Sequence, residues 1–331
     1  MNLQSKVIDH IVKGRVHDNT PVVREIADVL SISLDSAYRR LRGDTDLTAN
    51  ELEKLCVHYS ISIDSLLNQN AEMVSFTFRG TNTQPFSYSH YLEMMIRDLQ
   101  RLEEYKQTRI IYDAKDIPIF YHFVFPELAE FKGLFWEKTV YQNTSSKKKY
   151  FCLDSLDERN IDMGNKIFQL YCKIASIEIW NDEVLNSLLS QIRYYHESGF
   201  IQSRAVTEKL LTKVLELIDH LEYQAESGSK MPAGNRHDTT DGNFQLYYNE
   251  VVIGYNSLLL EYDEKREFHI GHNIINTLIC NNKDFCDFTY EQKRKMLGHS
   301  ILISTTAGKE RTKFFNRLRK KTHALHHELQ L

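Results

Sequence analysis

The segment SISLDSAYRRLRGDTDL, residues 31–47, decides how the N-terminal part of the chain folds. Ser33 has the side chain of a helix N-cap, and Gly43 suits a left-handed C-cap. Between these two residues the spacing predicts a helix over 34–42, with apolar inner positions at Leu34, Ala37, Tyr38 and Leu41. The outer, polar positions are then Asp35, Ser36, Arg39, Arg40 and Arg42. Three arginines on one short helix favour either a solvated helix end or contact with a polyanion.

Helices are also predicted on both sides of this segment. Apolar residues recur at helical spacing over 3–12, and Thr20 can cap a second helix that has Pro21 at its first position. Downstream, Thr48 and Glu51 form a capping box, and the short segment 63–67 closes the array. Five short helices, two of them joined by the turn 31–33, describe a compact helix-turn-helix bundle.

The stretch REIADVLSISLDSAYRRLRGDTDLTANELEKLCVHYSISIDSLL resembles the lambda-repressor-like (Xre/Cro-type) helix-turn-helix family over residues 20–67. Within it, DSAYRRLRGD is similar to the N-terminal domains of large regulators common in Bacteroidetes, which carry a long C-terminal domain. Two positions depart from the family pattern. Ser31 stands where many members have Gly, and Arg40 stands where an apolar residue is common, so Tyr38 and Leu41 are expected to supply core contacts instead.

The resemblance implies that the helix over 34–42 enters the major groove of a double-stranded DNA operator. Arg39 is then the first candidate for a base edge, followed by Ser36 and Asp35, because arginine can bind guanine with two hydrogen bonds. Phosphate contacts and capping would fall to Thr20, Ser33, Arg40 and Arg42. The alternative keeps Asp35 and the arginines as solvated charges that complement the helix dipole.

Composition limits the class of protein. The chain has 331 residues, 42% of them hydrophobic and 26% charged, which is ordinary for a globular protein of two or three domains. Neither a long apolar run nor a signal peptide occurs, so we expect a cytoplasmic protein without a membrane partner. The five cysteines are scattered without a CxxC pair, which favours free and mostly buried thiols.

Net charge argues against a protein that coats nucleic acid. The chain carries a formal charge of -4, and residues 1–70 hold eight Lys/Arg against ten Asp/Glu. DNA binding would therefore depend on how charge is distributed, and on homodimerisation, because one acidic bundle would bind weakly. Residues 290–321 are different, with ten Lys/Arg and two Asp/Glu. This segment is interpreted either as a solvated helix face or as an auxiliary surface for phosphates.

The predicted fold class is α+β, predominantly helical. The helix-turn-helix domain is assigned to residues 1–70 and a larger mixed region to 71–331, with a candidate break at 226–243 where Gly, Ser, Pro and Asp gather. Strands are predicted at 74–78, 109–114, 117–125, 244–248, 250–262 and 266–272. Helices are predicted at 88–106, 126–140, throughout 160–224, and at 309–328.

No catalytic, metal or cofactor site is expected. His269–His272 spell HIGH, a signature of class I aminoacyl-tRNA synthetases, but no dinucleotide-binding fold precedes it and no KMSKS loop follows. The histidines at 323, 326 and 327 lack a partner set for metal, and AGKE near Lys309 lacks the pattern of a phosphate loop.

The sequence therefore predicts a sequence-specific transcriptional regulator whose C-terminal region dimerises and senses a small-molecule or protein effector. Two alternatives remain open. One is an enzyme whose catalytic C-terminal domain is guided to DNA by the bundle, and the other is a protein-interaction scaffold whose bundle binds no DNA.

Overall fold

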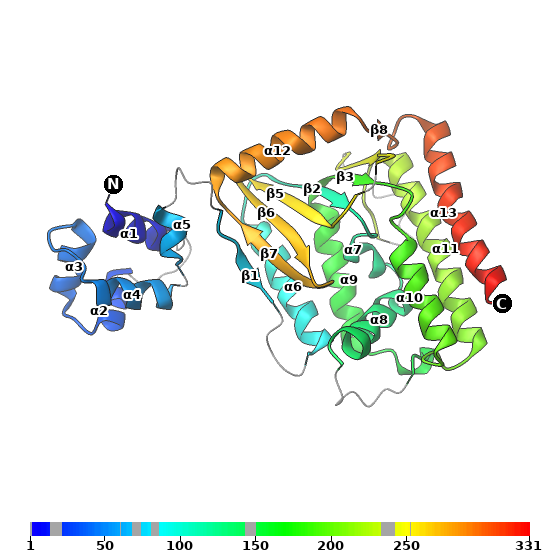
Figure 1. Ribbon diagram of the computed structural model, residues 1–331, viewed down its shortest axis with the longest axis horizontal. Helices are drawn as coiled ribbons and strands as arrows, with labels where there is room; N and C mark the ends of the chain where they lie inside the picture. Colours follow the sequence, from blue (N-terminus) through cyan, green and yellow to red (C-terminus); the bar gives the residue numbers. More distant parts are fainter. Residues whose placement is uncertain are drawn as a thin grey trace. The chain divides into compact units, whose positions relative to one another are not determined.

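The computed structural model describes residues 2–13, 22–59, 61–67, 74–80, 86–142, 150–232, 242–251 and 253–331. The chain divides into two compact units, Met1–Phe76 and Thr77–Leu331, which we describe separately (Figure 1). Its class is α+β with helices predominating, as predicted. In the described residues, no helix has the length and apolar character needed to cross a membrane.

The first unit is a small helical bundle. Its helices are α1 (Leu3–Lys13), α2 (Val22–Leu30), α3 (Leu34–Arg42), α4 (Ala49–His58) and α5 (Ile63–Leu67). All four later helices pack with α1 around a core that includes Val7, Ile26, Ala37 and Leu55. The predicted N-cap at Thr20 lies outside the described residues. The capping box of Thr48 and Glu51 is present.

The second unit is built on an eight-stranded mixed sheet. Its strands are β1 (Thr77–Arg79), β2 (Thr108–Ala114), β3 (Ala175–Trp180), β4 (Phe244–Tyr248), β5 (Ser257–Tyr262), β6 (Lys265–His272), β7 (Asn276–Cys280) and β8 (Ile301–Leu302). They lie in the order β1-β7-β6-β5-β2-β3-β4-β8, in which β2, β3 and β4 are parallel and the other pairings are antiparallel.

Helices cover both faces of this sheet (Figure 1). One face of β5 and β6 is covered by α12 (Lys283–Gly298). The other face packs on a helical layer made of α6 (Tyr88–Leu102), α7 (Ile119–His122), α8 (Pro126–Phe135), the π-helix η1 (Trp136–Val140), α9 (Glu158–Lys173), α10 (Asn186–Glu197) and α11 (Arg204–Ser227). The C-terminal helix α13 (Gly308–Glu328) packs along α11, and a short 3-10 turn, η2, spans Leu153–Ser155.

Two sequence predictions were wrong in this unit, and some elements were not predicted. The run 117–125 was predicted as a strand, but Ile119–His122 form α7, because Pro118 ends the extended segment and stands at the helix N-cap. The predicted helical region 160–224 is interrupted by β3, a short strand buried between two neighbours in the sheet. Neither α12 nor β7 was predicted.

Other predictions were confirmed. The helices at 88–106 and 309–328 correspond to α6 and α13, and the strands at 244–248 and 266–272 correspond to β4 and β6. The predicted strand 250–262 is shorter, since β5 begins at Ser257. All five cysteines are free, and four of them are buried. The candidate break at 226–243 falls partly outside the described residues.

A buried carboxylate lies where the sheet meets the helical layer. Glu178 on β3 is fully buried and accepts hydrogen bonds from Tyr121, Tyr171, Ser176 and the indole of Trp180. These four donors replace the water that the carboxylate loses on burial. Nearby, the ammonium of Lys230 donates to the carbonyl of Ile174.

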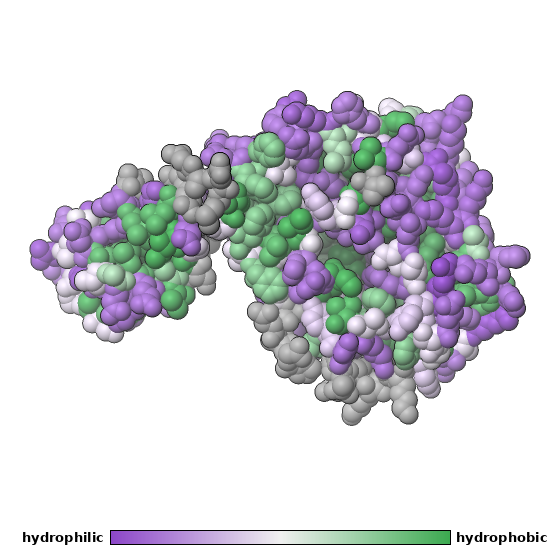
Figure 2. Space-filling model, in the orientation of Figure 1, coloured by the Kyte–Doolittle hydropathy of each residue, from purple (hydrophilic) through white to green (hydrophobic). Residues whose placement is uncertain are grey.

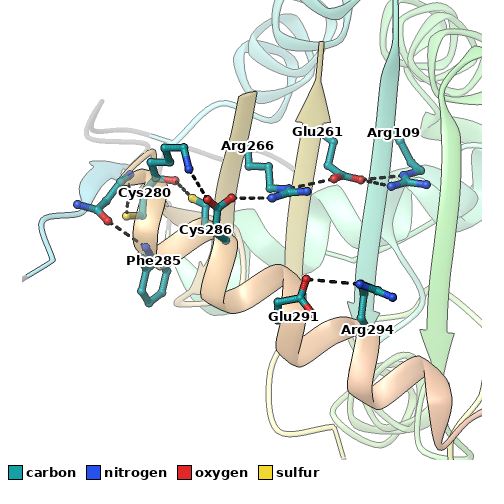
Figure 3. A network of polar contacts seen from close by, with 11 residues as sticks. Arg109, Glu261, Arg266, Cys280, Phe285, Cys286, Glu291 and Arg294 are labelled. Atoms are coloured by element: carbon teal, nitrogen blue, oxygen red, sulfur yellow. Dashed lines mark hydrogen bonds and ion pairs between the residues drawn. The ribbon is translucent and has the colours of Figure 1, made fainter. Parts of the chain in front are cut away.

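The opposite face holds a second buried charge. Lys293 of α12 donates to the carboxylate of Asp113 on β2 and, at 2.9 Å, to the hydroxyl of Ser257 on β5. A row of ion pairs runs beside it, from Arg109 through Glu261 to Arg266, which reaches Asp287 on α12 at 2.6 Å (Figure 3). Together these contacts fix α12 across the antiparallel part of the sheet.

The buried pair yields a stability prediction. Lys293→Met leaves the carboxylate of Asp113 buried without its counter-charge, so the free energy of unfolding of the larger unit should fall by about 3–5 kcal/mol. Chemical denaturation followed by tryptophan fluorescence measures this unit alone, because both tryptophans, Trp136 and Trp180, lie in it. Lys295→Met, at an exposed position of the same helix, should change the value by less than about 0.5 kcal/mol.

Removing both charges tests the cause. The double variant with Asp113→Asn and Lys293→Met should recover part of the loss, because no charge is then left buried alone. A double variant as unstable as Lys293→Met would show that the loss comes from packing of the lysine stem.

Candidate nucleic-acid interface

The helix α3 is defined at both ends by its own sequence. The side chain of Ser33 accepts a hydrogen bond from the amide of Ser36 at 3.2 Å, which caps the first turn. Gly43 has a φ of +80° and donates its amide to the carbonyl of Arg40, while Asp44 donates to that of Arg39. The predicted start and end of this helix are therefore confirmed.

One side of α3 faces away from the bundle core. Successive residues of a helix turn by about 100°, so positions 34, 35, 38, 39 and 42 share one arc. All five are exposed, and we call them the outer arc: Leu34, Asp35, Tyr38, Arg39 and Arg42. Ala37, on the other side, is fully buried.

The predicted inner face of α3 was half wrong. Ala37 is buried and Leu41 packs against the core, but Leu34 is 46% exposed and Tyr38 is 51% exposed. Tyr38 therefore does not supply the core contact that was expected of it. The sequence spacing was ambiguous because 34, 37, 38 and 41 form a stripe wider than this short helix buries.

Arg40 takes the place that an apolar residue would fill. Its guanidinium forms an ion pair with Glu51 of α4 at 2.8 Å, and its side chain is only 17% exposed. A further bond runs to the carbonyl of Ser36 at 3.3 Å. Arg40 thus links α3 to α4, and any contact that it makes with phosphate would have to be shared with Glu51.

The carboxylate of Glu51 makes two contacts, one that caps α4 and one with α3. One carboxylate oxygen accepts from the amide of Thr48 at 2.8 Å, and the other meets Arg40. Burial acts to raise the pKa of Glu51, but the hydrogen bonds from Thr48 and Arg40 outweigh it and hold the pKa below its ordinary value. The carboxylate therefore stays charged through the neutral range and keeps its ion pair with Arg40.

Sequence reasoning missed Gln4, which fixes the loop after α3. Its side-chain amide donates to the carbonyls of Arg40 and Thr45, both at 2.9 Å, and its oxygen accepts from the amide of Leu47 at 2.8 Å. A buried glutamine in α1 holds the segment that follows the outer arc. An isolated polar residue at an otherwise apolar helix position was the available signal.

The remaining predicted site residues have different surroundings. Arg39 is exposed and has no side-chain hydrogen bond or ion pair among the residues that the structure describes, whereas Arg42 lies 3.2 Å from the carboxylate of Asp44. Ser36 is half-buried and bonds to the hydroxyl of Ser33 at 3.0 Å, which places it beside the outer arc. The structure therefore brings Asp35, Arg39 and Arg42 together and separates Ser36 and Arg40 from them.

The basic segment 290–321 is largely neutralised within its own unit. Lys293 is buried on Asp113, Arg317 meets Asp182 at 2.8 Å, and Arg319 bonds to Asp219 and Glu222 on α11. The exposed sides of α12 and α13 are hydrophilic in Figure 2. These pairs favour the interpretation of a solvated, packed helix face over a surface for phosphates.

Comparison with known proteins adds one match. Residues 13–83 match the model of the BetR domain, a helix-turn-helix-type DNA-binding domain of transcription regulators. The matched segment begins at the end of α1 and contains α2 to α5, including the whole outer arc. No curated protein and no solved structure matches the chain. The match supports a DNA-binding regulator in general terms.

Substitutions of Arg39 and Arg40 should differ in their effect on the local stability of the bundle. Arg40→Met leaves Glu51 without its counter-charge, so local opening of α3 and α4 should become easier by about 1–2 kcal/mol. Arg39→Met removes no partner contact and should change local stability by less than about 0.5 kcal/mol. Hydrogen exchange of peptides from residues 34–58 in the full chain measures both. Equal protection in the two variants would contradict the structural role of Arg40.

Proposed function

We propose that this chain is a sequence-specific transcriptional regulator of the lambda-repressor-like (Xre/Cro) type that reads an operator with α3. The observation that carries the proposal is the outer arc, which presents Asp35, Arg39 and Arg42 to solvent on a helix capped at both ends. A short helix of this kind fits the major groove, where arginine discriminates guanine.

The roles within the outer arc follow from geometry. Arg39, whose guanidinium has no partner among the described residues, is the candidate for a base edge, whereas Arg42, in the last turn beside Asp44, suits a phosphate. Arg40 acts as a positioning residue, because its guanidinium is held by Glu51. Leu34 and Tyr38 add apolar surface that can touch the methyl group of thymine.

Dimerisation and sensing belong to the same proposal. A single acidic bundle would bind weakly, so we expect two chains to read half-sites about 34 Å apart or a multiple of that spacing. The larger unit supplies the surface for dimerisation and the site for an effector. We assign these two roles to the larger unit because the C-terminal regions of such regulators commonly have them, and the assignment rests on this resemblance.

The enzyme alternative has one observation in its favour, a cavity in the larger unit that contains Lys132, His122 and Asp116. Burial, with a smaller effect from Lys132, lowers the pKa of His122 to about 3, so this imidazole stays neutral at ordinary pH. It therefore cannot exchange protons as a general base near pH 7. We propose binding without catalysis for this cavity. The scaffold alternative predicts no DNA binding at any salt concentration.

Selection of genomic fragments with the purified full chain should recover a palindrome, and affinity should fall steeply with salt. On that operator, Arg39→Ala should relax the choice of base at one position by about 1–3 kcal/mol. Arg42→Ala should weaken all sequences alike and reduce the salt dependence by about one phosphate contact. Sequence-blind losses of equal size from both changes would refute this division of roles.

The apolar part of the outer arc gives an independent prediction. Tyr38→Ala should weaken operator binding several-fold, because the ring covers the groove side of α3, and it should leave the bundle folded. Val57→Ala is the matched control, since Val57 on α4 is 74% exposed but lies outside the outer arc. Fluorescence anisotropy with labelled operator measures both variants. If the two changes weakened binding equally, the outer arc would not be the contact surface.

A further inference from the structure

The larger unit contains a cavity of about 490 Å³ between the sheet and its helical layer. It lies at the carboxyl end of β2, and its lining comes from α6, α8, η1, the start of β5 and the start of β7. Figure 2 shows the surface hollowed beside the ends of these strands. Ligands of open sheets often bind at the carboxyl ends of parallel strands, and this volume suits a small molecule.

Lys132 of α8 is a buried cation in the wall of this cavity. The residue is 7% exposed, and its ammonium donates to the amide oxygen of Gln191 at 2.7 Å. Among the described residues, no carboxylate lies within ion-pair distance of it. Of the other two buried lysines, Lys293 meets Asp113 directly. Lys230 resembles Lys132, because each donates to an uncharged oxygen and lies over an aromatic ring, that of Tyr171 for Lys230 and that of Trp136 for Lys132. Lys132 is the one of the three that lines the cavity.

Burial lowers the pKa of Lys132 to about 8, while the charge of Asp116 acts to raise it. Asp116 is itself held by Asn256, whose side-chain amide donates to it at 3.3 Å. The lysine thus keeps its proton near neutral pH without a bonded counter-ion. A buried ammonium in this condition is stabilised by any anion that can reach it.

Trp136 provides another buried donor on the same wall. It lies one helical turn after Lys132, is 3% exposed, and its indole nitrogen has no hydrogen-bond partner among the described residues. Buried indoles usually find an acceptor. Trp136 begins the π-helix η1, a type of irregularity frequent at functional sites. The ammonium of Lys132, whose acceptor is the uncharged oxygen of Gln191, and the indole of Trp136, which has no acceptor among the described residues, therefore belong to the same wall of the cavity.

The rest of the lining is mostly apolar and aromatic. It includes Tyr91, Met95, Tyr112, Phe120 and Leu258. At the rim, Arg79 is paired with Asp98 at 2.6 Å, so its charge is already satisfied. Two ammonium groups in the described lining have no ion pair, those of Lys132, which is buried, and Lys115, which is exposed to solvent. A phosphate would need several buried cations or a helix N-terminus. A singly charged group such as a carboxylate matches the one buried ammonium.

We propose that the cavity binds a small organic monoanion, with its carboxylate on Lys132 and Trp136 and an apolar or aromatic body against the lining residues Tyr91, Tyr112 and Phe120. The assignment of this ligand as the effector rests on the proposed function. Binding itself depends only on the larger unit.

Fluorine NMR of the full chain labelled with 5-fluorotryptophan tests the site directly. Only two resonances are expected, from Trp136 in the cavity wall and from Trp180 beside Glu178, and Trp136→Phe assigns them. The probes are phenylacetate, 3-phenylpropionate and octanoate, each compared with its neutral amide. At least one anion should shift the Trp136 resonance saturably in the millimolar range, and its amide should bind at least about tenfold more weakly.

Lys132→Met should abolish the shift, whereas Lys295→Met on the exposed side of α12 should retain it. If Lys132→Met does not fold, which an altered Trp180 resonance would reveal, the comparison of acid with amide in the unchanged chain still decides. No shift of Trp136 by any of the three anions, or equal binding of acid and amide, would overturn the proposal.

The same samples separate this inference from the proposed function. All NMR titrations are made without DNA, and operator binding is measured separately with and without the bound anion. If the chain bound the anion but no DNA, the cavity assignment would stand and the proposed function as a transcriptional regulator would be refuted. If the chain bound the operator but none of the anions, the proposed function as a regulator would stand and the anion site would be refuted.

Discussion

A charged side chain that leaves water must find a counter-charge or hydrogen bonds within the protein, and this constraint organises both units. In the bundle, Arg40 is accommodated by Glu51, and the pair links α3 to α4. In the larger unit, Lys293 is accommodated by Asp113 and Glu178 by four donors, which fixes α12 and the helical layer on opposite faces of the sheet. Lys132 is the case in which the protein leaves the requirement partly unmet.

The two candidate sites hold their cationic side chains in opposite surroundings. On α3, the outer arc keeps Arg39 in water, where a charge is inexpensive to hold and free to bind a polyanion. In the cavity, Lys132 is held in an apolar surrounding, where one well-placed anion is worth more than it would be at the surface. The first arrangement suits a long, highly charged partner, and the second suits a small molecule that carries a single charge.

Features that depend on residues close together in the sequence could be predicted from the sequence. Features that depend on contacts between distant residues could not. The caps at Ser33, Gly43 and Thr48 are local, so the ends of α3 and the start of α4 were predicted correctly. The direction of Tyr38 was not, because it depends on how α3 packs against the rest of the bundle. α7 and β3 were missed because buried apolar runs have no periodicity that separates helix from strand.

The cavity could not have been predicted, since its lining joins segments from Arg79 to Thr277. In the aromatic run 120–125, Tyr121 and Phe123 are buried in the core, whereas Phe120 and His122 also line the cavity. Among the described residues, Lys132 is buried without a charged partner and the indole of Trp136 has no acceptor, and these properties exist only in the folded chain.

The replacement of an apolar contact by Arg40 and Glu51 makes the cohesion of the bundle sensitive to acid. Because the pKa of Glu51 is depressed in the folded state, its stabilising effect is complete above the ordinary pKa of a glutamate and is lost as the pH falls through the lower, folded value. Once protonated, Glu51 holds Arg40 less firmly, and α3 loses an ion pair that links it to α4. An aliphatic side chain at this position would carry no such dependence.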